Sequence, residues 1–252
     1  MIPIPFIVIM VALVVASLFL PKSRRRSRSP SKRQRRTSAK PNDRKRAVVP
    51  QPSPEARGII GERDIANVFE SLAQNGFVGS AVRNVYVPKE DGTFSEIDVV
   101  YVCSKGLFVV ESKNYSGWIY GSEDDQNWTE SFRPGKTNQL FNPIKQNEGH
   151  VRYLKQYLKV PLRIMPVVVF SDSCELKKVE LKSSPKPTVI QLRELYNFVA
   201  NQWRFAPDLL SGEQIITIAS MLENLANVSD DVKKAHVARV ESLRTSPHGS
   251  RR

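Results

Sequence analysis

The chain has 252 residues, of which 40% are hydrophobic, a length and composition typical of one or two globular domains. Its net charge of +13 is concentrated in one segment, because residues 22–46 contain thirteen Lys and Arg against one acid, Asp43, and so carry +12 of that charge. The two cysteines, Cys103 and Cys174, exclude a disulfide framework and a four-thiolate zinc site, and they favour free thiols in a reducing compartment.

Residues 1–21 contain no charged side chain. About twenty helical residues span roughly 30 Å, the thickness of the hydrocarbon core of a bilayer, so this segment predicts one transmembrane anchor. A cleaved signal peptide is the alternative, but no positive charge precedes the apolar run and the run is long for a signal peptide. The basic residues that follow predict a single-pass membrane protein with its N-terminus outside and its C-terminal domain in the cytoplasm.

The basic segment, residues 22–46, is predicted to be disordered because it cannot bury a core. A topology signal or a binding site for anionic lipid head groups is the favoured interpretation. Binding to nucleic acid phosphates is the second interpretation. A Pro-rich stretch over residues 47–58 ends the tail, so the globular part is expected to begin near Gly58.

The globular part opens with a predicted helix over residues 61–76, whose apolar side chains recur at helical spacing. Three strands follow at residues 81–88, 94–102 and 107–113, and short turns join them as a meander. The later predicted elements are a small hairpin at 117–121 and 127–131, a loop at 136–141, an amphipathic helix at 142–159 with Asn142 as its N-cap, an apolar strand at 163–172, a strand and a helix over 188–201, and a helix at 211–227. This order predicts an α/β sandwich around a mixed sheet.

Charged side chains gather at the predicted ends of these strands. Glu111 and Lys113 share one face of the third strand because side chains alternate, and Asp98 on the neighbouring strand is expected to converge with them. Glu62, near the start of the opening helix, is expected to approach the same end of the sheet. Clustered carboxylates are costly to bury, so Lys113 and a divalent metal such as Mg²⁺ are predicted to compensate them. Such a set suits hydrolysis of a phosphodiester.

The order of these residues resembles a known family. Gly-Glu, Ile-Asp, Glu-x-Lys-Asn-Tyr-x-Gly and Asn-Pro-x-x-Gln follow one another over roughly residues 57–170, and this set is similar to the nuclease-related domain (NERD) of the PD-(D/E)XK nuclease superfamily. The resemblance implies a restriction-endonuclease-like sandwich with a mixed central sheet and an α-β-β-β-α-β core, preceded here by the transmembrane helix. Ile97 stands where the superfamily has a proline before the Asp, and the chain lacks the cysteines of the zinc module found in some relatives.

The resemblance also implies roles for five residues. Asp98 and Glu111 would bind Mg²⁺ or Mn²⁺, and Glu62 would be an added acidic ligand or would position water. Lys113 would assist the attacking water, and Gln146, on the helix after the meander, would be an accessory polar residue near the site.

Plainer interpretations stay open for several of these residues. Glu111 and Lys113 by themselves fit an ordinary same-face ion pair, which contributes less than about 1 kcal/mol. His150, alone on the amphipathic helix, is more often structural or exposed than a ligand. Three aromatic residues of the small hairpin suit either stacking on unpaired bases or packing of the hairpin, with packing favoured: Trp118, Tyr120 and Trp128.

The sequence therefore predicts a membrane-anchored, Mg²⁺-dependent nuclease that acts on nucleic acid, with DNA favoured over RNA. The alternative is a non-catalytic nucleic-acid- or protein-binding module tethered to the membrane. The expected divisions are an anchor at 1–21, a basic and Pro/Ser-rich linker at 22–56, a domain core at 57–173, a strand and helix extension at 174–228 and a frayed tail at 229–252.

Overall fold

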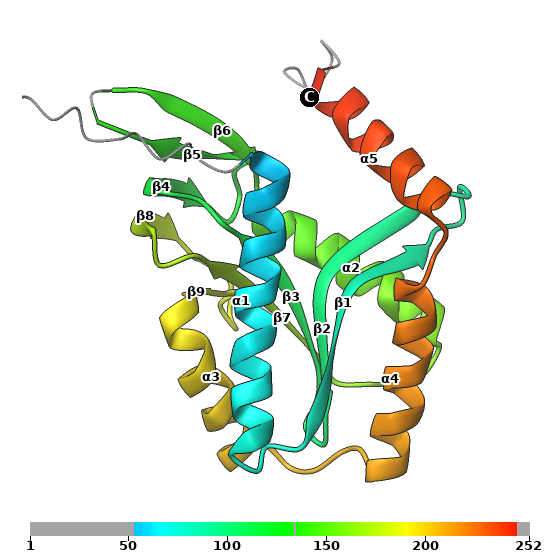
Figure 1. Ribbon diagram of the computed structural model, residues 1–252. Helices are drawn as coiled ribbons and strands as arrows, with labels where there is room; N and C mark the ends of the chain where they lie inside the picture. The colour runs from blue at the N-terminus through cyan, green and yellow to red at the C-terminus, as the bar shows by residue number, and fades with distance from the viewer. Residues whose placement is uncertain (1–52, 134, 246–252) are drawn as a thin grey trace, which may run out of the picture. The chain divides into compact units, whose positions relative to one another are not determined.

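The computed structural model describes residues 53–133 and 135–245, which all belong to one compact unit of the chain (Figure 1). The predicted anchor at 1–21 and the basic segment at 22–46 lie outside the described residues. Within the described part of the chain, no helix combines the length and the apolar character needed to cross a membrane.

A five-stranded mixed sheet forms the centre of the unit, in the order β1-β2-β3-β7-β9 (Figure 1). Its strands are β1 (Gly79–Pro88), β2 (Phe94–Cys103), β3 (Gly106–Lys113), β7 (Ile164–Phe170) and β9 (Thr188–Gln191). The first three pair antiparallel as the predicted meander, whereas β7 runs parallel to both β3 and β9. The mixed sheet predicted from the sequence is confirmed.

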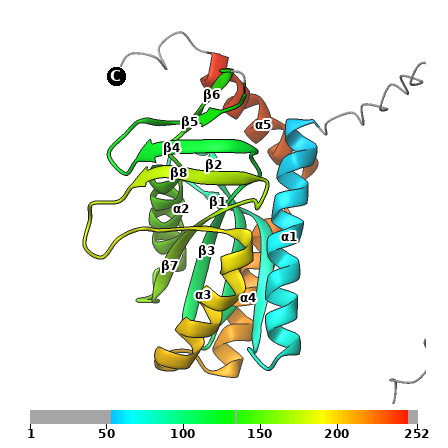
Figure 2. The same cartoon turned by 90° about the vertical axis from the view of Figure 1, so that its left-hand side faces the viewer.

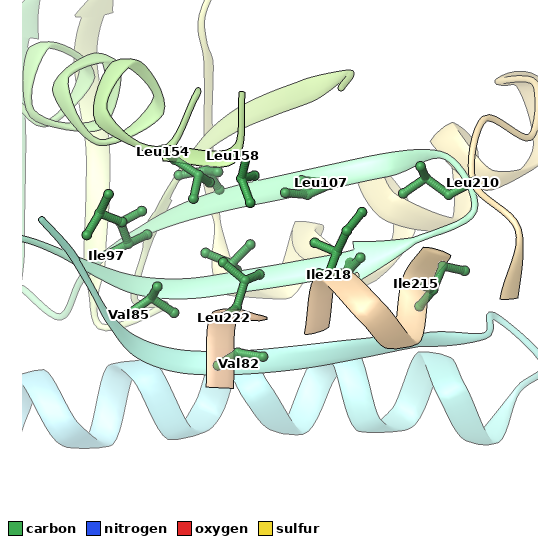
Figure 3. Packing of buried hydrophobic residues seen from close by; sticks show 14 residues of the cluster. Val82, Val85, Ile97, Leu107, Leu154, Leu158, Leu210, Ile215, Ile218 and Leu222 are labelled. Carbon is green, nitrogen blue, oxygen red and sulfur yellow. The ribbon is translucent and has the colours of Figure 1, made fainter. Parts of the chain in front are cut away.

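Four helices cover this sheet, two on each face. α1 (Pro54–Gln74) and α3 (Leu192–Phe205) pack on one face, around Phe69, Tyr101 and Phe108. α2 (Pro143–Leu158) and α4 (Gly212–Ala226) pack on the other, where apolar side chains of both helices meet those of β1, β2 and β3 (Figure 3). The result is a sandwich of three layers with two apolar cores.

A second sheet has four strands in the order β6-β5-β4-β8 (Figure 2). They are β4 (Gly117–Ser122), β5 (Asn127–Ser131), β6 (Thr137–Phe141) and β8 (Cys174–Glu180). β4 and β5 form the predicted hairpin, and β8 runs parallel to β4. One face of this sheet is buried through Ile119 and Trp128, which join a third apolar cluster with residues of α2 and β7.

Helix caps follow the local sequence closely. Ser53 caps α1 by accepting a hydrogen bond from the backbone N–H of Ala56 at 3.2 Å. Asn142 caps α2 by accepting one from the backbone N–H of Ile144 at 3.0 Å, as predicted. Ser211 caps α4 and forms a capping box with Gln214.

Four expectations differ from the structure. Helix α1 begins at Pro54, inside the Pro-rich stretch that was expected to precede the globular part, because Ser53 caps it there. Residues 137–141, predicted as a loop, form strand β6 because they pair along β5. The boundary after residue 173 does not separate a core from an appendage, since β9 belongs to the central sheet and α3 and α4 belong to its two cores. The tail from residue 229, expected to fray, contains helix α5 (Asp230–Thr245), which contacts β2 through His236 and the turn between β1 and β2 through Arg239.

Candidate active site

The carboxyl end of β3 carries the two charged residues of the Glu-x-Lys motif. Leu107 and Val109 of this strand lie in the core beneath α2 and α4, and Glu111 and Lys113 follow them on the same face because side chains alternate. β7 runs parallel to β3 through this region. The pair therefore lies at the carboxyl ends of two parallel strands, a common location of ligand sites in α/β proteins.

Glu111 is a buried carboxylate, with a side chain only 1% exposed. Its Oε1 accepts a hydrogen bond from Lys113 Nζ, and its Oε2 lies 3.0 Å from His150 Nε2. Burial would raise the pKa of this carboxyl, but the charge of Lys113 and the hydrogen bond from His150 outweigh that effect and lower it. Glu111 is therefore held in its ionised form inside the protein.

His150 positions Glu111 from helix α2. A carboxylate can only accept, so His150 Nε2 is the donor to Glu111. The other ring nitrogen, Nδ1, lies 2.7 Å from Ser95 Oγ on β2, and this contact fixes the orientation of the ring. This role was not predicted from the sequence, in which His150 stands alone on its helix. Its spacing of four residues from Gln146, which places both on one helix face, was the available signal.

Lys113 is bound between two elements. Its ammonium donates to Glu111 on its own strand and to Gln146 Oε1 on α2, the latter at 3.1 Å. Burial would lower the pKa of Lys113, but the negative charges of Glu111 and Asp98 raise it above its ordinary value. Lys113 is thus a fixed positive charge, and Gln146 holds it over the end of the sheet.

Asp98 lies on β2, next to β3. Its Oδ2 accepts a hydrogen bond from the backbone N–H of Ser112 at 2.7 Å. The side chain keeps some solvent exposure, yet desolvation of its carboxyl and the neighbouring charge of Glu111 raise its pKa well above the ordinary value. Lys113 only partly offsets this effect. The positive charge near Asp98 is therefore not sufficient to stabilise its ionised form.

Glu62 reaches the same region from helix α1. A Cβ on Gly61 would lie 2.7 Å from Ser112 Oγ, so the helix passes close to the end of β3 and the next residue, Glu62, is placed there. Desolvation, followed by the charge of Glu96, raises the pKa of Glu62 to about 7, against opposing effects of Arg83 and a hydrogen bond with Asn84. Glu62 can therefore take up or release a proton near neutral pH.

Asn84 belongs to an irregular point of β1. Its φ of 53° lies in the left-handed region, which Asn tolerates better than most residues. The pairing of β1 with β2 keeps one register on both sides of Asn84, from Arg83 opposite Val99 to Val85 opposite Ile97, so the ladder is interrupted at this position without a bulge. The side chain of Asn84 is hydrogen-bonded to Glu62.

Glu96 extends the acidic region along β2. Its Oε1 accepts a hydrogen bond from the hydroxyl of Tyr86 at 2.6 Å, and its Oε2 lies 3.3 Å from Nε2 of His236 on α5. This contact joins the last described helix to Glu96. Among the charges near Glu62, that of Glu96 has the largest effect on the pKa of Glu62. Neither Glu96 nor His236 was predicted as part of the site.

The predicted residues thus lie at one end of the central sheet. Lys113 hydrogen-bonds to Glu111 and Gln146, whereas Asp98 and Glu62 act on this group through their charges. The three carboxyls outnumber the single ammonium, and the raised pKa values of Asp98 and Glu62 mark a deficit of positive charge that suits a divalent cation. In the residues that the structure describes, no three His, Cys, Asp or Glu side chains are already grouped to hold a metal ion.

Residues 57–171 match the nuclease-related domain, NERD, as a family. An uncharacterized protein of Bacillus anthracis is 30% identical over 183 residues, which cover 72% of this chain and 82% of that protein. The chain belongs to the nuclease-related domain family. The match spans α1 to β7, and so its range includes the five predicted site residues: Glu62, Asp98, Glu111, Lys113 and Gln146. No solved structure is significantly similar to this NERD protein.

Proposed function

We propose that this NERD protein is a metal-dependent nuclease that hydrolyses phosphodiester bonds of nucleic acid. The observation that carries the proposal is the buried Glu111 carboxylate, which is paired with Lys113 and lies beside Asp98, a carboxyl with a raised pKa. Perturbed titratable groups of opposite charge at the end of a sheet are typical of a catalytic site.

Each residue has a distinct role in this proposal. Asp98 and Glu111, with Glu62 as an added ligand, would hold Mg²⁺ or Mn²⁺. The bound ion supplies a Lewis acid for the phosphoryl oxygen and lowers the pKa of a bound water. Lys113 stabilises the negative charge that develops on the phosphate, and Gln146 keeps its ammonium in place.

Where Glu62 positions water and is not a ligand of the ion, it is the residue best suited to move a proton. Its pKa of about 7 leaves both protonation states populated near neutral pH, as a general base or acid requires. His150 does not contact substrate in this proposal. It is a positioning residue, because it holds the second oxygen of Glu111 while Ser95 holds its ring.

Membrane attachment is a further part of the proposal. Residues 1–21 are long and apolar enough to span a bilayer, and the basic residues after them favour a cytoplasmic domain. The same basic residues, 22–46, would lie next to anionic lipid. These residues are outside the described part of the chain, so the support comes from the sequence alone.

A non-catalytic binding module is the second candidate. It is favoured by one observation: both oxygens of Glu111 already contact protein groups, Lys113 and His150, and this leaves the carboxylate less free to bind a metal. Such a domain would bind nucleic acid or a protein without cleaving it.

Calorimetry of the full chain with Mg²⁺ or Mn²⁺ separates the two candidates, together with cleavage assays on DNA and RNA. The nuclease proposal predicts metal binding that Asp98→Asn and Glu111→Gln abolish, whereas Glu175→Gln on the exposed side of β8 leaves it intact. Metal binding that persists in both site variants would contradict the proposal.

A further inference from the structure

The outer face of the second sheet is lined with aromatic side chains. Ile119 and Trp128 point into the third core, and side chains alternate along a strand, so Trp118 and Tyr120 lie on the opposite face. Leu140 is buried in the same way, which places Phe141 of β6 on the outer face. In the view of Figure 2 no helix lies in front of the four strands.

These aromatic side chains are exposed to an unusual degree. Tyr120 is 36% exposed and Phe141 is 45% exposed. Trp118 is half-buried, and the atoms that cover its ring include two cations, Arg133 at 4.8 Å and Lys177 at 5.6 Å from the ring centre. Trp128, by contrast, is fully buried against Phe170, so the predicted packing role is confirmed for this tryptophan alone.

The outer face is positively charged at the end formed by the turn between β5 and β6, whereas the turn between β4 and β5 carries three consecutive acidic residues. Arg133 and Lys136 lie in the turn between β5 and β6. Lys177 and Lys178 of β8 are paired with acids of the same strand, at 2.6 Å and 3.0 Å. The surplus of positive charge therefore comes from the turn between β5 and β6, next to Trp118.

We propose that this outer face binds single-stranded nucleic acid by stacking bases on Trp118, Tyr120 and Phe141. Aromatic side chains interleaved with bases on an open sheet form a stacking platform, since every nucleobase has a π-face. Trp118 and Tyr120 are two residues apart on one strand, roughly 6.8 Å, which is twice the rise between stacked bases in a duplex. Bases on both rings must therefore be splayed apart, and a single strand allows this whereas a duplex does not.

The cations at Trp118 fit the same ligand. A base that stacks on the indole displaces an exposed cation–π contact, which is the weaker interaction. The Arg133 guanidinium can then pair with a phosphate beside that base, whereas Lys177 keeps its ion pair with Glu175. This exchange explains how a ring partly covered by cations can still bind a nucleobase.

The outer face is also close to the candidate active site along the chain. β4 begins four residues after Lys113, and Trp118 follows at five, so an extended chain separates them by at most about 17 Å. Binding on this face does not require cleavage. Where the proposed nuclease function holds, the bound strand would lead toward Glu111 and Lys113.

Fluorescence anisotropy with the full chain tests this proposal. The probes are a labelled oligothymidylate of about 12 nucleotides and a duplex of the same length, in EDTA so that no metal-dependent cleavage occurs. Trp118→Leu is expected to weaken single-strand binding about tenfold and duplex binding less than about twofold. Trp118→Phe should recover most of the single-strand affinity because it restores an aromatic face.

Matched variants separate stacking from other causes. The basic segment 22–46 is the same in every variant, so its contribution to affinity cancels. Phe205→Leu removes an aromatic side chain that is 78% exposed on α3 and should leave binding unchanged. Binding is measured in EDTA and cleavage is measured separately with Mg²⁺, so a failed nuclease and a failed binding face give different results. If Trp118→Leu lowers the melting temperature, Tyr120→Leu replaces it.

Three outcomes would overturn the proposal. The first is single-strand affinity that Trp118→Leu and Tyr120→Leu do not change. The second is an equal loss for the single strand and the duplex, which indicates a purely electrostatic contact. The third is self-association of the wild type that Trp118→Leu abolishes, which identifies a second copy of the chain as the occupant of this face.

Discussion

The charge state of Glu62 near neutral pH depends on its surroundings in the folded protein. Its pKa is raised from 4.5 to about 7, first by burial and then by the charge of Glu96. Between these two values the folded protein keeps a proton that the unfolded chain releases, so stability is highest below pH 4.5 as far as this group is concerned and falls as pH rises toward 7.

The sign of this effect is testable by urea unfolding of the metal-free protein. The free energy of unfolding contributed by Glu62 is expected to fall by about 1–3 kcal/mol between pH 4.5 and pH 7.5, and Glu62→Gln should remove that part of the slope. Glu70→Gln, on the exposed side of α1, is the control and should keep it. An unchanged slope in Glu62→Gln would show that this carboxyl is not perturbed.

His150 gives a second prediction at the residue scale. His150→Phe leaves Glu111 Oε2 and the hydroxyl of Ser95 without their observed partner. The expected cost is about 2–4 kcal/mol of unfolding free energy, because a buried carboxylate loses a hydrogen bond. Arg152→Ala, exposed on the same helix, should change stability by less than about 0.5 kcal/mol. Equal stability of both variants would rule out the positioning role.

Helix α2 is the element on which the geometry of the site depends. Asn147 Nδ2 donates to the backbone carbonyls of Val109 on β3 and Val167 on β7, at 3.0 Å and 3.2 Å. Asn142, at the start of the helix, donates to the carbonyls of Ser122 and Asp125 at the turn after β4. Helix α2 is therefore hydrogen-bonded to both sheets. These bonds fix the position of Gln146, which accepts a hydrogen bond from Lys113.

Asn147→Leu tests whether the hydrogen bonds from Asn147 fix helix α2 on the central sheet. The substitution leaves two buried carbonyls without their side-chain donor, so we expect a loss of about 2–3 kcal/mol in thermal or urea unfolding. Gln156→Leu adds the same side chain at an exposed position of α2 and serves as the control. If the two variants unfold alike, the bonds from Asn147 do not fix the helix.

Elements with strong periodicity were predictable from sequence, and those that depend on a partner were not. The meander from β1 to β3 and helix α2 have clear apolar patterns, and the Asp98, Glu111 and Lys113 positions followed from their register. β6 is short and polar, and it is a strand only because it pairs with β5. α5 lacks a strong apolar stripe, so its charged sequence suggested fraying.

The candidate site shows the same division. Glu111 and Lys113 are two residues apart on one strand, so alternation alone placed them together. His150 and Ser95 come from distant positions in the chain, 55 residues apart, and their contact depends on how α2 crosses the sheet. A helix crossing cannot be read from the sequence of the helix itself, and for that reason the support of Glu111 was missed.

At the scale of the whole molecule, charge divides the chain into two parts. The basic segment, residues 22–46, carries +12 of the net charge of +13, so the remainder is almost neutral. A nearly neutral domain gains little from long-range attraction to nucleic acid. The basic segment is therefore expected to dominate any salt-sensitive binding.

Vesicle binding tests the role of this segment. Full chain with residues 22–46 intact should bind vesicles containing phosphatidylserine more tightly than a variant with the Arg and Lys of this segment changed to Ser, and the difference should shrink as salt rises. Neutral vesicles are the control. A difference that is absent, or that does not respond to salt, would exclude a role in lipid binding.

We propose above all that the site at the end of β3 cleaves nucleic acid with the help of a metal ion. The most direct test of this proposal is the single-turnover cleavage rate of the full chain on labelled DNA and RNA with Mg²⁺ or Mn²⁺. We expect that EDTA stops cleavage and that Asp98→Asn, Glu111→Gln and Lys113→Met each reduce its rate at least about 100-fold, while Glu175→Gln has no effect. Cleavage that survives Asp98→Asn and Glu111→Gln, or no cleavage by the folded wild type, would contradict the proposal.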